Sequence, residues 1–156
     1  MLKNHFYDVY DLQHLSEIET VFKTDGLVGL NVTIPFKEKV VPYLDELSDE
    51  AEKTGAVNCI LIKDQVKKGY NTDVFGFEKT LVLHRKDFHD SALVLGNGGA
   101  AKAVKYVLEQ HQIPYQTVSR NADLNFGNLT AETVRKNRLI IQCTPVGTFP
   151  NVDACL

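Results

Sequence analysis

The chain has 156 residues, of which 44% are hydrophobic and 24% are charged, and its formal net charge is −3. These proportions are typical of a soluble globular protein and argue against intrinsic disorder. Because no block of like charge accompanies the small net charge, nucleic acids and membrane surfaces are not expected as partners. A small molecule is the class of partner that remains.

The cysteines and histidines predict no metal site. Cys59, Cys143 and Cys155 stand in unrelated settings, which argues against a disulfide framework and favours a reducing, cytoplasmic compartment. The five histidines lack the spacing of metal ligands, so we expect no bound metal. The sequence contains no run of about 18 apolar residues and no basic-then-apolar leader, so neither a membrane-spanning helix nor a signal peptide is expected.

The beginning of the chain predicts a strand, a helix and a second strand. Residues 6–10 alternate aromatic and polar side chains, as a half-buried strand does. Residues 16–19 resemble a capping box that opens a short helix, and the Asp-Gly pair at 25–26 closes it. Residues 27–34 return to a strand pattern, and a crossover helix would make the two strands parallel.

The next stretch predicts short helices and a hairpin. Pro35 is expected in the first turn of a helix, and Ser48 is expected to start another helix that ends near Gly55. Strand patterns at residues 56–63 and 66–70 are separated by only two residues. Such a short connection indicates a β-hairpin.

A polar run without periodicity, residues 84–90, follows a predicted helix over 73–83 and is the expected boundary between two domains. Beyond it, buried-type strands alternate with helices, which predicts an α/β fold with a parallel, doubly wound sheet. We expect strands at 91–95, 115–118 and 139–142 and helices at 102–112 and 130–136.

A glycine turn, Gly96-x-Gly98-x-x-Ala101, lies between a predicted strand and a predicted helix. In this context the first glycine permits a tight turn, the second lets the backbone approach a pyrophosphate, and the small third residue allows close helix packing. Free N–H groups at the helix start would then face the phosphates. The sequence therefore predicts a dinucleotide site, with a purely structural turn as the alternative.

The end of the next predicted strand bears on the choice of dinucleotide. A site for NAD has Asp or Glu there to bind the ribose hydroxyls, whereas this chain has Ser119 and Arg120. An arginine favours the additional 2′-phosphate of NADP, so NADP is the expected cofactor. The alternative is an arginine that is merely solvated in a loop.

A second set of polar residues lies in the first half of the chain. Thr33 and Lys37 follow one predicted strand, Asn58 lies at the start of another, and Asn71 and Asp73 open a helix. Side chains at strand ends and helix starts can converge on a cleft. Taken singly, Asp73 could instead cap its helix and Lys37 could be a solvated surface lysine.

Six short motifs together resemble the shikimate dehydrogenase family, in order and in approximate spacing, over essentially the whole chain. They are NVTIPFK, GAVN, YNTD, LGNGGAAKAV, SR and TPVG. The resemblance implies an NADP-dependent oxidoreductase that interconverts 3-dehydroshikimate and shikimate on the path to aromatic amino acids.

The resemblance also implies roles for particular residues. Lys37 and Asp73 match the family's catalytic pair, in which the lysine handles the proton and the aspartate holds it in place. Thr33, Asn58 and Asn71 match substrate contacts. The cofactor would be bound by Gly96, Asn97, Gly98, Gly99, Ala100, Ser119, Arg120, Thr144, Pro145, Val146 and Gly147.

The match has limits that shape the expected domains. The family's motif for the substrate carboxylate, which precedes the NVT strand, and its later NG…Q segment have no counterpart here. We therefore expect residues 1–86 to be a substrate-binding and catalytic domain without its first strand, and residues 87–156 to be an NADP-binding Rossmann-like domain without its C-terminal part. Open sheet edges would favour association, so a homodimer is one expected form. A quinate dehydrogenase that uses NAD, or a nucleotide-binding fragment without turnover, are the alternative functions.

Overall fold

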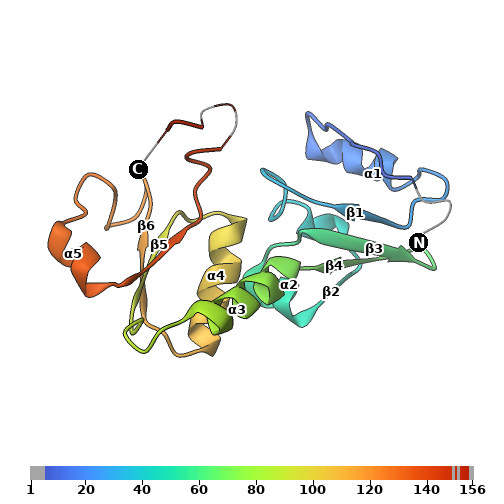
Figure 1. The fold of residues 1–156 in the computed structure, drawn as a ribbon. Helices are drawn as coiled ribbons and strands as arrows, with labels where there is room; N and C mark the ends of the chain where they lie inside the picture. Colours follow the sequence, from blue (N-terminus) through green and yellow to red (C-terminus); the bar gives the residue numbers. More distant parts are fainter. Residues whose placement is uncertain (1–5, 149, 151, 155–156) are drawn as a thin grey trace.

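The computed structural model describes residues 6–148, 150 and 152–154. It is an α/β structure in which a mixed sheet, formed by the first half of the chain, is followed by a parallel sheet. Figure 1 shows helices α3 and α4 between the two sheets. The α/β class and the parallel second sheet were both predicted from the sequence.

The first sheet has the strand order β1-β3-β4-β2, with β1 at Gly29–Asn31, β2 at Glu46–Leu47, β3 at Cys59–Lys63 and β4 at Val66–Tyr70. β3 pairs antiparallel with both β1 and β4, whereas β2 pairs parallel with β4. The predicted hairpin is therefore confirmed. Its two turn residues, Asp64 and Gln65, have φ angles of 50° and 65°, the left-handed values that a tight hairpin turn requires.

The second sheet has the order β6-β5-β7, with β5 at Ala92–Leu95, β6 at Tyr115–Val118 and β7 at Leu139–Gln142. Both pairings are parallel. β5 therefore lies in the centre, and its first three residues are buried, as a strand covered on both faces requires. The carboxyl ends of all three strands lie at one edge of the sheet, the position where open α/β sheets bind ligands.

The helical elements in the described residues are η1 at Leu15–Glu17, α1 at Ile18–Val21, η2 at Val41–Tyr43, α2 at Asp49–Thr54, α3 at Thr72–His84, α4 at Gly99–Gln110 and α5 at Ala131–Lys136. α2 begins and ends as predicted, with Ser48 capping its start and Gly55 in the left-handed conformation (φ 61°) after its end. The capping box joins His14 and Glu17, slightly earlier than predicted, since the His14 amide donates to the Glu17 carboxylate at 2.6 Å.

Two apolar cores support these sheets. One gathers residues from α1, α2 and β3 around Val40 and Ile60. The other gathers the buried faces of α4 and β5, and it also includes Val74 and Leu81 of α3. Full burial of a large aliphatic side chain contributes roughly 1.5 to 3 kcal/mol, so the second core fixes α3 against α4. The first turn of α3 is thereby held close to the start of α4.

Residues 6–10 do not form the predicted strand. They have no regular secondary structure, and the side chains of Phe6 and Tyr7 are 95% and 78% exposed. Alternating side chains make a strand only where a neighbouring strand supplies hydrogen bonds, and none of the described strands pairs with this segment. The predicted parallel pairing of this segment with the strand at 27–34 is therefore wrong, and β1 pairs antiparallel with β3.

Pro35 does not open a helix either. Residues 34–40 form successive turns and lead into the short 3-10 helix η2. The reason is visible in the hydrogen bonding, because the Lys37 carbonyl accepts from the Val57 amide at 2.7 Å. A carbonyl bonded to another segment does not close the next helical turn, so the lysine segment is tied to the start of β3 instead.

Among the described residues, no helix is long and apolar enough to cross a membrane.

Candidate active site

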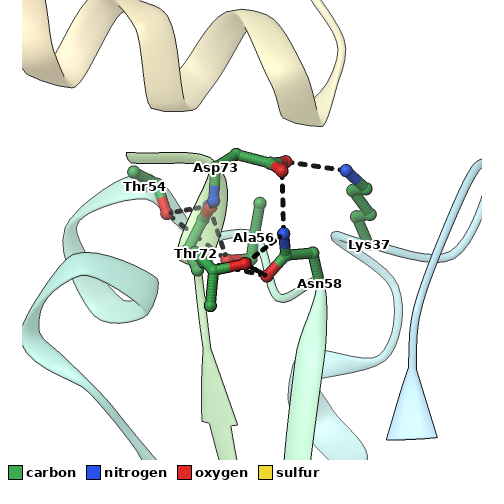
Figure 2. Close-up of polar contacts among 7 residues, drawn as sticks. Lys37, Thr54, Ala56, Asn58, Thr72 and Asp73 are labelled. Atoms are coloured by element: carbon green, nitrogen blue, oxygen red, sulfur yellow. Dashed lines mark hydrogen bonds and ion pairs between the residues drawn. The ribbon is translucent and has the colours of Figure 1, made fainter. Parts of the chain in front are cut away.

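Lys37 and Asp73 form the centre of the candidate site. The Nζ of Lys37 donates to Oδ2 of Asp73 at 2.7 Å, and the side chains are 18% and 34% exposed (Figure 2). The turn segment after β1 carries the lysine, and the first turn of α3 carries the aspartate. The structure thus brings together two residues that the sequence analysis had paired by resemblance alone. Their partial exposure leaves the pair accessible to a small molecule.

Asn58 holds the second oxygen of Asp73. Its Nδ2 donates to Oδ1 of Asp73 at 2.8 Å, while its Oδ1 accepts from the Thr72 amide at 2.9 Å (Figure 2). The Thr72 hydroxyl is exposed and lies 3.0 Å from Asn58 Nδ2. Both oxygens of Asp73 are therefore engaged, and the carboxylate is oriented toward Lys37.

Asn71 has a different role from the predicted substrate contact. It is only 5% exposed, and its amide group donates to Thr54 Oγ1 and to the Ala56 carbonyl, both at 3.0 Å. Its Oδ1 accepts from the Asp73 amide at 3.2 Å, which makes it the N-cap of α3. A buried carboxamide with all these bonds made is not available to a ligand. Asn71 instead fixes where α3, and hence Asp73, begins.

Thr33 lies just beyond β1 and is exposed. Its carbonyl accepts from the Phe36 amide at 2.9 Å, and its hydroxyl makes no hydrogen bond with any residue that the structure describes. The structure does not bring this hydroxyl into the Lys37, Asp73 and Asn58 network, although all four residues lie in the same part of the fold. The free hydroxyl is available to a ligand.

The glycine turn leads from β5 into α4, and its glycines differ in backbone conformation and in surroundings. Gly96 has a φ of 117°, and a Cβ on it would lie 2.9 Å from the Cys143 carbonyl oxygen. Only glycine fits this position without strain. A Cβ on Gly98 would meet nothing within 4 Å, so its surroundings are open. Asn97 and Ala100 are exposed on the same turn.

α4 begins at Gly99, three residues before the predicted start at Lys102, and no side chain caps its start. The first amides of the helix are thus available to an anionic group, as in a dinucleotide site. Asn97 is held from within the helix, because Lys105 Nζ donates to its Oδ1 at 2.6 Å. The sequence analysis did not single out Lys105, since nothing in the glycine pattern marks a lysine two turns into the helix.

Burial shifts the pKa values of two side chains near the glycine turn, Lys105 and Cys143. Burial lowers the pKa of Lys105, although nearby Cys143 and Glu109 oppose that shift. Burial also raises the pKa of Cys143 to about 11, with Lys105 acting in the opposite direction. The thiol at the end of β7 is therefore protonated at neutral pH and behaves as a small apolar group.

The remaining predicted cofactor contacts lie at the carboxyl ends of β6 and β7. Arg120 is exposed just after β6, next to the half-buried Ser119. Residues 144–147, the predicted TPVG turn, follow β7, and Gly147 has a φ of 81°. Thr144 lies against the glycine turn, since a Cβ on Gly96 would be 3.2 Å from its methyl group. These segments therefore share one edge of the parallel sheet with the glycine turn.

The lysine segment also contacts the start of α4. Lys102 Nζ donates to Glu38 Oε2 at 2.6 Å, and a Cβ on Gly99 would lie 3.2 Å from Lys37 Cβ. No sequence pattern indicated these contacts, because 64 residues separate Glu38 from Lys102. In the described part of the chain, no group of three or more His, Cys, Asp or Glu is arranged to hold a metal ion.

The fold and the site define a class of protein, an α/β protein in which a Lys-Asp pair on a mixed sheet adjoins the glycine turn of a Rossmann-like parallel sheet. Residues 3–60 match the family described as shikimate dehydrogenase substrate binding domain. Over these residues the chain matches the substrate-binding domain of the shikimate dehydrogenase family, and relatives named as shikimate dehydrogenases match most of its length.

Particular relatives show how far the likeness extends. A shikimate dehydrogenase (NADP(+)) from Clostridium beijerinckii is 36% identical over 160 residues, which cover 94% of this chain and 59% of the relative. The crystal structure of shikimate 5-dehydrogenase from Thermus thermophilus in complex with NADP(H) and shikimate is 30% identical, with a TM-score of 0.73 over 90% of this chain and 56% of that one. Quinate dehydrogenase from Corynebacterium glutamicum in complex with NAD is 27% identical, with a TM-score of 0.66 over 89% of this chain and 57% of that one. The chain thus spans 56–59% of the length of these three relatives.

Proposed function

We propose that this chain carries the catalytic pair and the cofactor site of an NADP-dependent shikimate dehydrogenase, which reversibly reduces 3-dehydroshikimate to shikimate. The observation that carries the proposal is the 2.7 Å contact between Lys37 and Asp73, beside the N-terminus of the helix that follows the glycine turn. The match to the family's substrate-binding domain and the relatives named for shikimate and NADP support it.

Lys37 is the proposed proton donor and acceptor. Reduction of a ketone produces an alkoxide that must receive a proton, and an ammonium group within hydrogen-bonding distance can supply it. Asp73 keeps the ammonium in one position, and Asn58 in turn keeps the aspartate in place. Each of these contacts removes freedom from the proton-transferring group before substrate arrives, which is how preorganisation contributes to rate.

Thr33 and Asn58 are the proposed contacts for the ring hydroxyls of the substrate. The Thr33 hydroxyl is exposed and has no partner in the described part of the chain. Asn58 can exchange its contact with the exposed Thr72 hydroxyl for one with a substrate hydroxyl while keeping its bond to Asp73. A polyol is the class of ligand that such neutral donors and acceptors recognise.

The residues present fit a dinucleotide. The open space at Gly98 allows a pyrophosphate to approach the backbone, and the uncapped start of α4 offers amide donors. Arg120, exposed at the end of β6, is the proposed partner of the 2′-phosphate, which favours NADP over NAD. When bound, the cofactor supplies the hydride, and residues 144–147 would lie beside its nicotinamide end. Residues 1–86 and 87–156 are accordingly the proposed substrate-binding and NADP-binding domains.

The test separates binding from turnover. NADP+ binding would be measured by calorimetry and shikimate oxidation by NADPH absorbance, for the wild type, for Lys37→Ala and for the exposed neighbour variant Lys39→Ala. We expect the wild type and Lys39→Ala to bind and oxidise, and Lys37→Ala to bind NADP+ while losing turnover by at least about 100-fold. Turnover unaffected by Lys37→Ala would refute the assignment.

Two alternatives have their own outcomes in the same experiment. Saturable NADP+ binding without oxidation by the wild type would favour a nucleotide-binding fragment, in keeping with the partial coverage of the relatives. A higher kcat/KM for quinate with NAD than for shikimate with NADP would favour a quinate dehydrogenase, to which the chain is also similar. Sedimentation equilibrium would decide whether the protein is a homodimer.

A further inference from the structure

The glycine turn contains two adjacent glycines, and the structure gives them different surroundings. Gly98 precedes α4 with a φ of −88°, and a Cβ on it would meet nothing within 4 Å. Gly99 is the first residue of the helix, and a Cβ on it would lie 3.2 Å from Lys37 Cβ and 3.3 Å from Lys37 Cδ. Two carbon atoms are at optimal separation at roughly 3.5 to 4.0 Å, so these distances are too short for undisturbed packing.

We infer that Gly99 is a positioning residue for Lys37, and that it lacks a side chain to make room for the lysine rather than for the cofactor. Its missing side chain lets the start of α4 lie directly against the aliphatic part of the lysine. The inference rests on the proposed function, because the position of Lys37 matters for the reaction only if the lysine handles the substrate proton.

Other contacts show that the lysine segment cannot easily yield to an added methyl group. The Lys37 carbonyl is bonded to the Val57 amide at 2.7 Å, and the Lys37 ammonium is bonded to Asp73. Glu38 is tied to Lys102 in the first turn of α4 at 2.6 Å. A Cβ on Gly99 would also lie 3.8 Å from the Ala56 side chain, which is fully buried. The strain of an added methyl group would therefore fall on the lysine side chain or on the position of α4.

The contact has a consequence for catalysis. The turn proposed to bind the cofactor and the lysine proposed to move the proton touch each other through this glycine. Figure 2 shows the translucent ribbon of a helix above the Lys37 and Asp73 side chains, which agrees with the short distances from Gly99. A displacement of about 1 Å in a catalytic group costs roughly 100-fold in rate, so a shift of a few tenths of an ångström is expected to cost about tenfold or less.

The two glycines provide a matched pair of variants for the test. In Gly98→Ala the added methyl group enters open space and obstructs a pyrophosphate without touching Lys37. In Gly99→Ala it presses on Lys37, while the helix itself gains propensity, since alanine is preferred to glycine in a helix by about 1 kcal/mol. Loss of function in Gly99→Ala would therefore not come from a weaker helix, and thermal unfolding of both variants checks this.

Two measurements on the full chain distinguish the roles. Calorimetry gives the Kd for NADP+, and the NMR chemical shift of the Lys37 side chain, assigned with Lys37→Gln, reports its surroundings. We expect Gly99→Ala to move the Lys37 resonance and to change Kd less than about twofold, and Gly98→Ala to raise Kd at least about tenfold (1.4 kcal/mol) and to leave the resonance in place. Where the wild type turns over shikimate, Gly99→Ala should lower kcat rather than raise KM.

The inference is overturned if the Lys37 resonance is the same in Gly99→Ala and in the wild type, or if Gly99→Ala weakens NADP+ binding as much as Gly98→Ala does. Absence of NADP+ binding by the wild type would refute the proposed function instead. The NMR comparison would still decide whether Gly99 positions Lys37, because it does not depend on cofactor or turnover. A larger residue, in Gly99→Val, should move the resonance further than alanine does.

Discussion

Replacement of Asn71 by alanine should destabilise the protein more than the loss of an ordinary helix cap does. The Asn71 side chain caps α3 through the Asp73 amide, and its own amide group donates to Thr54 and to the Ala56 carbonyl. Loss of the cap costs about 1 kcal/mol, and loss of two buried hydrogen bonds costs about 1 kcal/mol each. Both acceptors keep another contact, because the Thr54 hydroxyl also lies 2.6 Å from the Glu50 carbonyl oxygen and 3.4 Å from the Ala56 carbonyl oxygen. The higher penalty for orphaned groups therefore does not apply.

The expected loss for Asn71→Ala is therefore about 3 kcal/mol, out of a typical total of about 5 to 15 kcal/mol for a domain. A chain of this size loses roughly 2 to 4 °C in Tm for each kcal/mol, so the expected decrease is about 6 to 12 °C. The matched control is Ser48→Ala, which removes only a cap, because the Ser48 hydroxyl accepts a single amide bond from Ala51 at 3.3 Å. We expect it to cost about 1 kcal/mol.

Urea unfolding followed by circular dichroism measures both variants, and an unchanged m-value would show that the difference lies in stability. Asn71→Ser keeps an oxygen for the cap and removes the amide donors, so it should fall between the wild type and the alanine variant. Equal losses for Asn71→Ala and Ser48→Ala would refute the reasoning. They would mean that the buried amide bonds contribute nothing, and that Asn71 is free for another role, such as the substrate contact that its motif implied.

Three further predictions concern the second half of the chain. Burial raises the pKa of Cys143 to about 11. Its alkylation by iodoacetamide at pH 8, followed by mass spectrometry, should therefore be at least about tenfold slower than that of a cysteine in a short peptide. Equal rates would contradict this expectation. Burial, with a hydrogen bond to a glutamate, raises the pKa of Tyr115 to about 12, so its contribution to stability is complete below about pH 10 and is lost as the pH rises through 12. Tyr115→Phe should therefore lose less stability than the wild type between pH 10 and pH 12 in urea unfolding, and identical pH profiles would argue against the shift. Lys105→Gln removes the hydrogen bond that holds Asn97 on the glycine turn and should raise the Kd for NADP+ about fivefold. The control Lys136→Gln, on α5, should leave this Kd unchanged. Equal effects of the two variants would show that Lys105 does not act through the glycine turn.

Much of the second half of the fold could be predicted because its signals are local. Strands 92–95, 115–118 and 139–142 are short apolar or β-branched runs between turn residues, and the glycine turn occurs in the one context that gives it meaning. The hairpin after residue 63 was predictable for the same reason, since two adjacent turn residues fix its register.

The failures lie where a local pattern depended on a distant partner. Residues 6–10 have the alternation of a strand, but alternation does not supply a neighbour to pair with. Pro35 fits a helix start, yet the carbonyl needed for the next turn is bonded to the amide of Val57. In both cases the outcome depends on hydrogen bonds with a distant segment of the chain, and a window of neighbouring residues contains no information about such a segment.

The candidate site divides in the same way. The amino-acid sequence by itself determined which residue types are available, namely a lysine after a strand, an aspartate at a helix start and glycines in a turn. Only the tertiary structure decided that Lys37 meets Asp73 at 2.7 Å, that Asn71 turns inward, and that Gly99 lies against the lysine. The physical reason is that α3 is fixed against α4 by a shared apolar core, and that core is assembled from segments which the sequence leaves far apart.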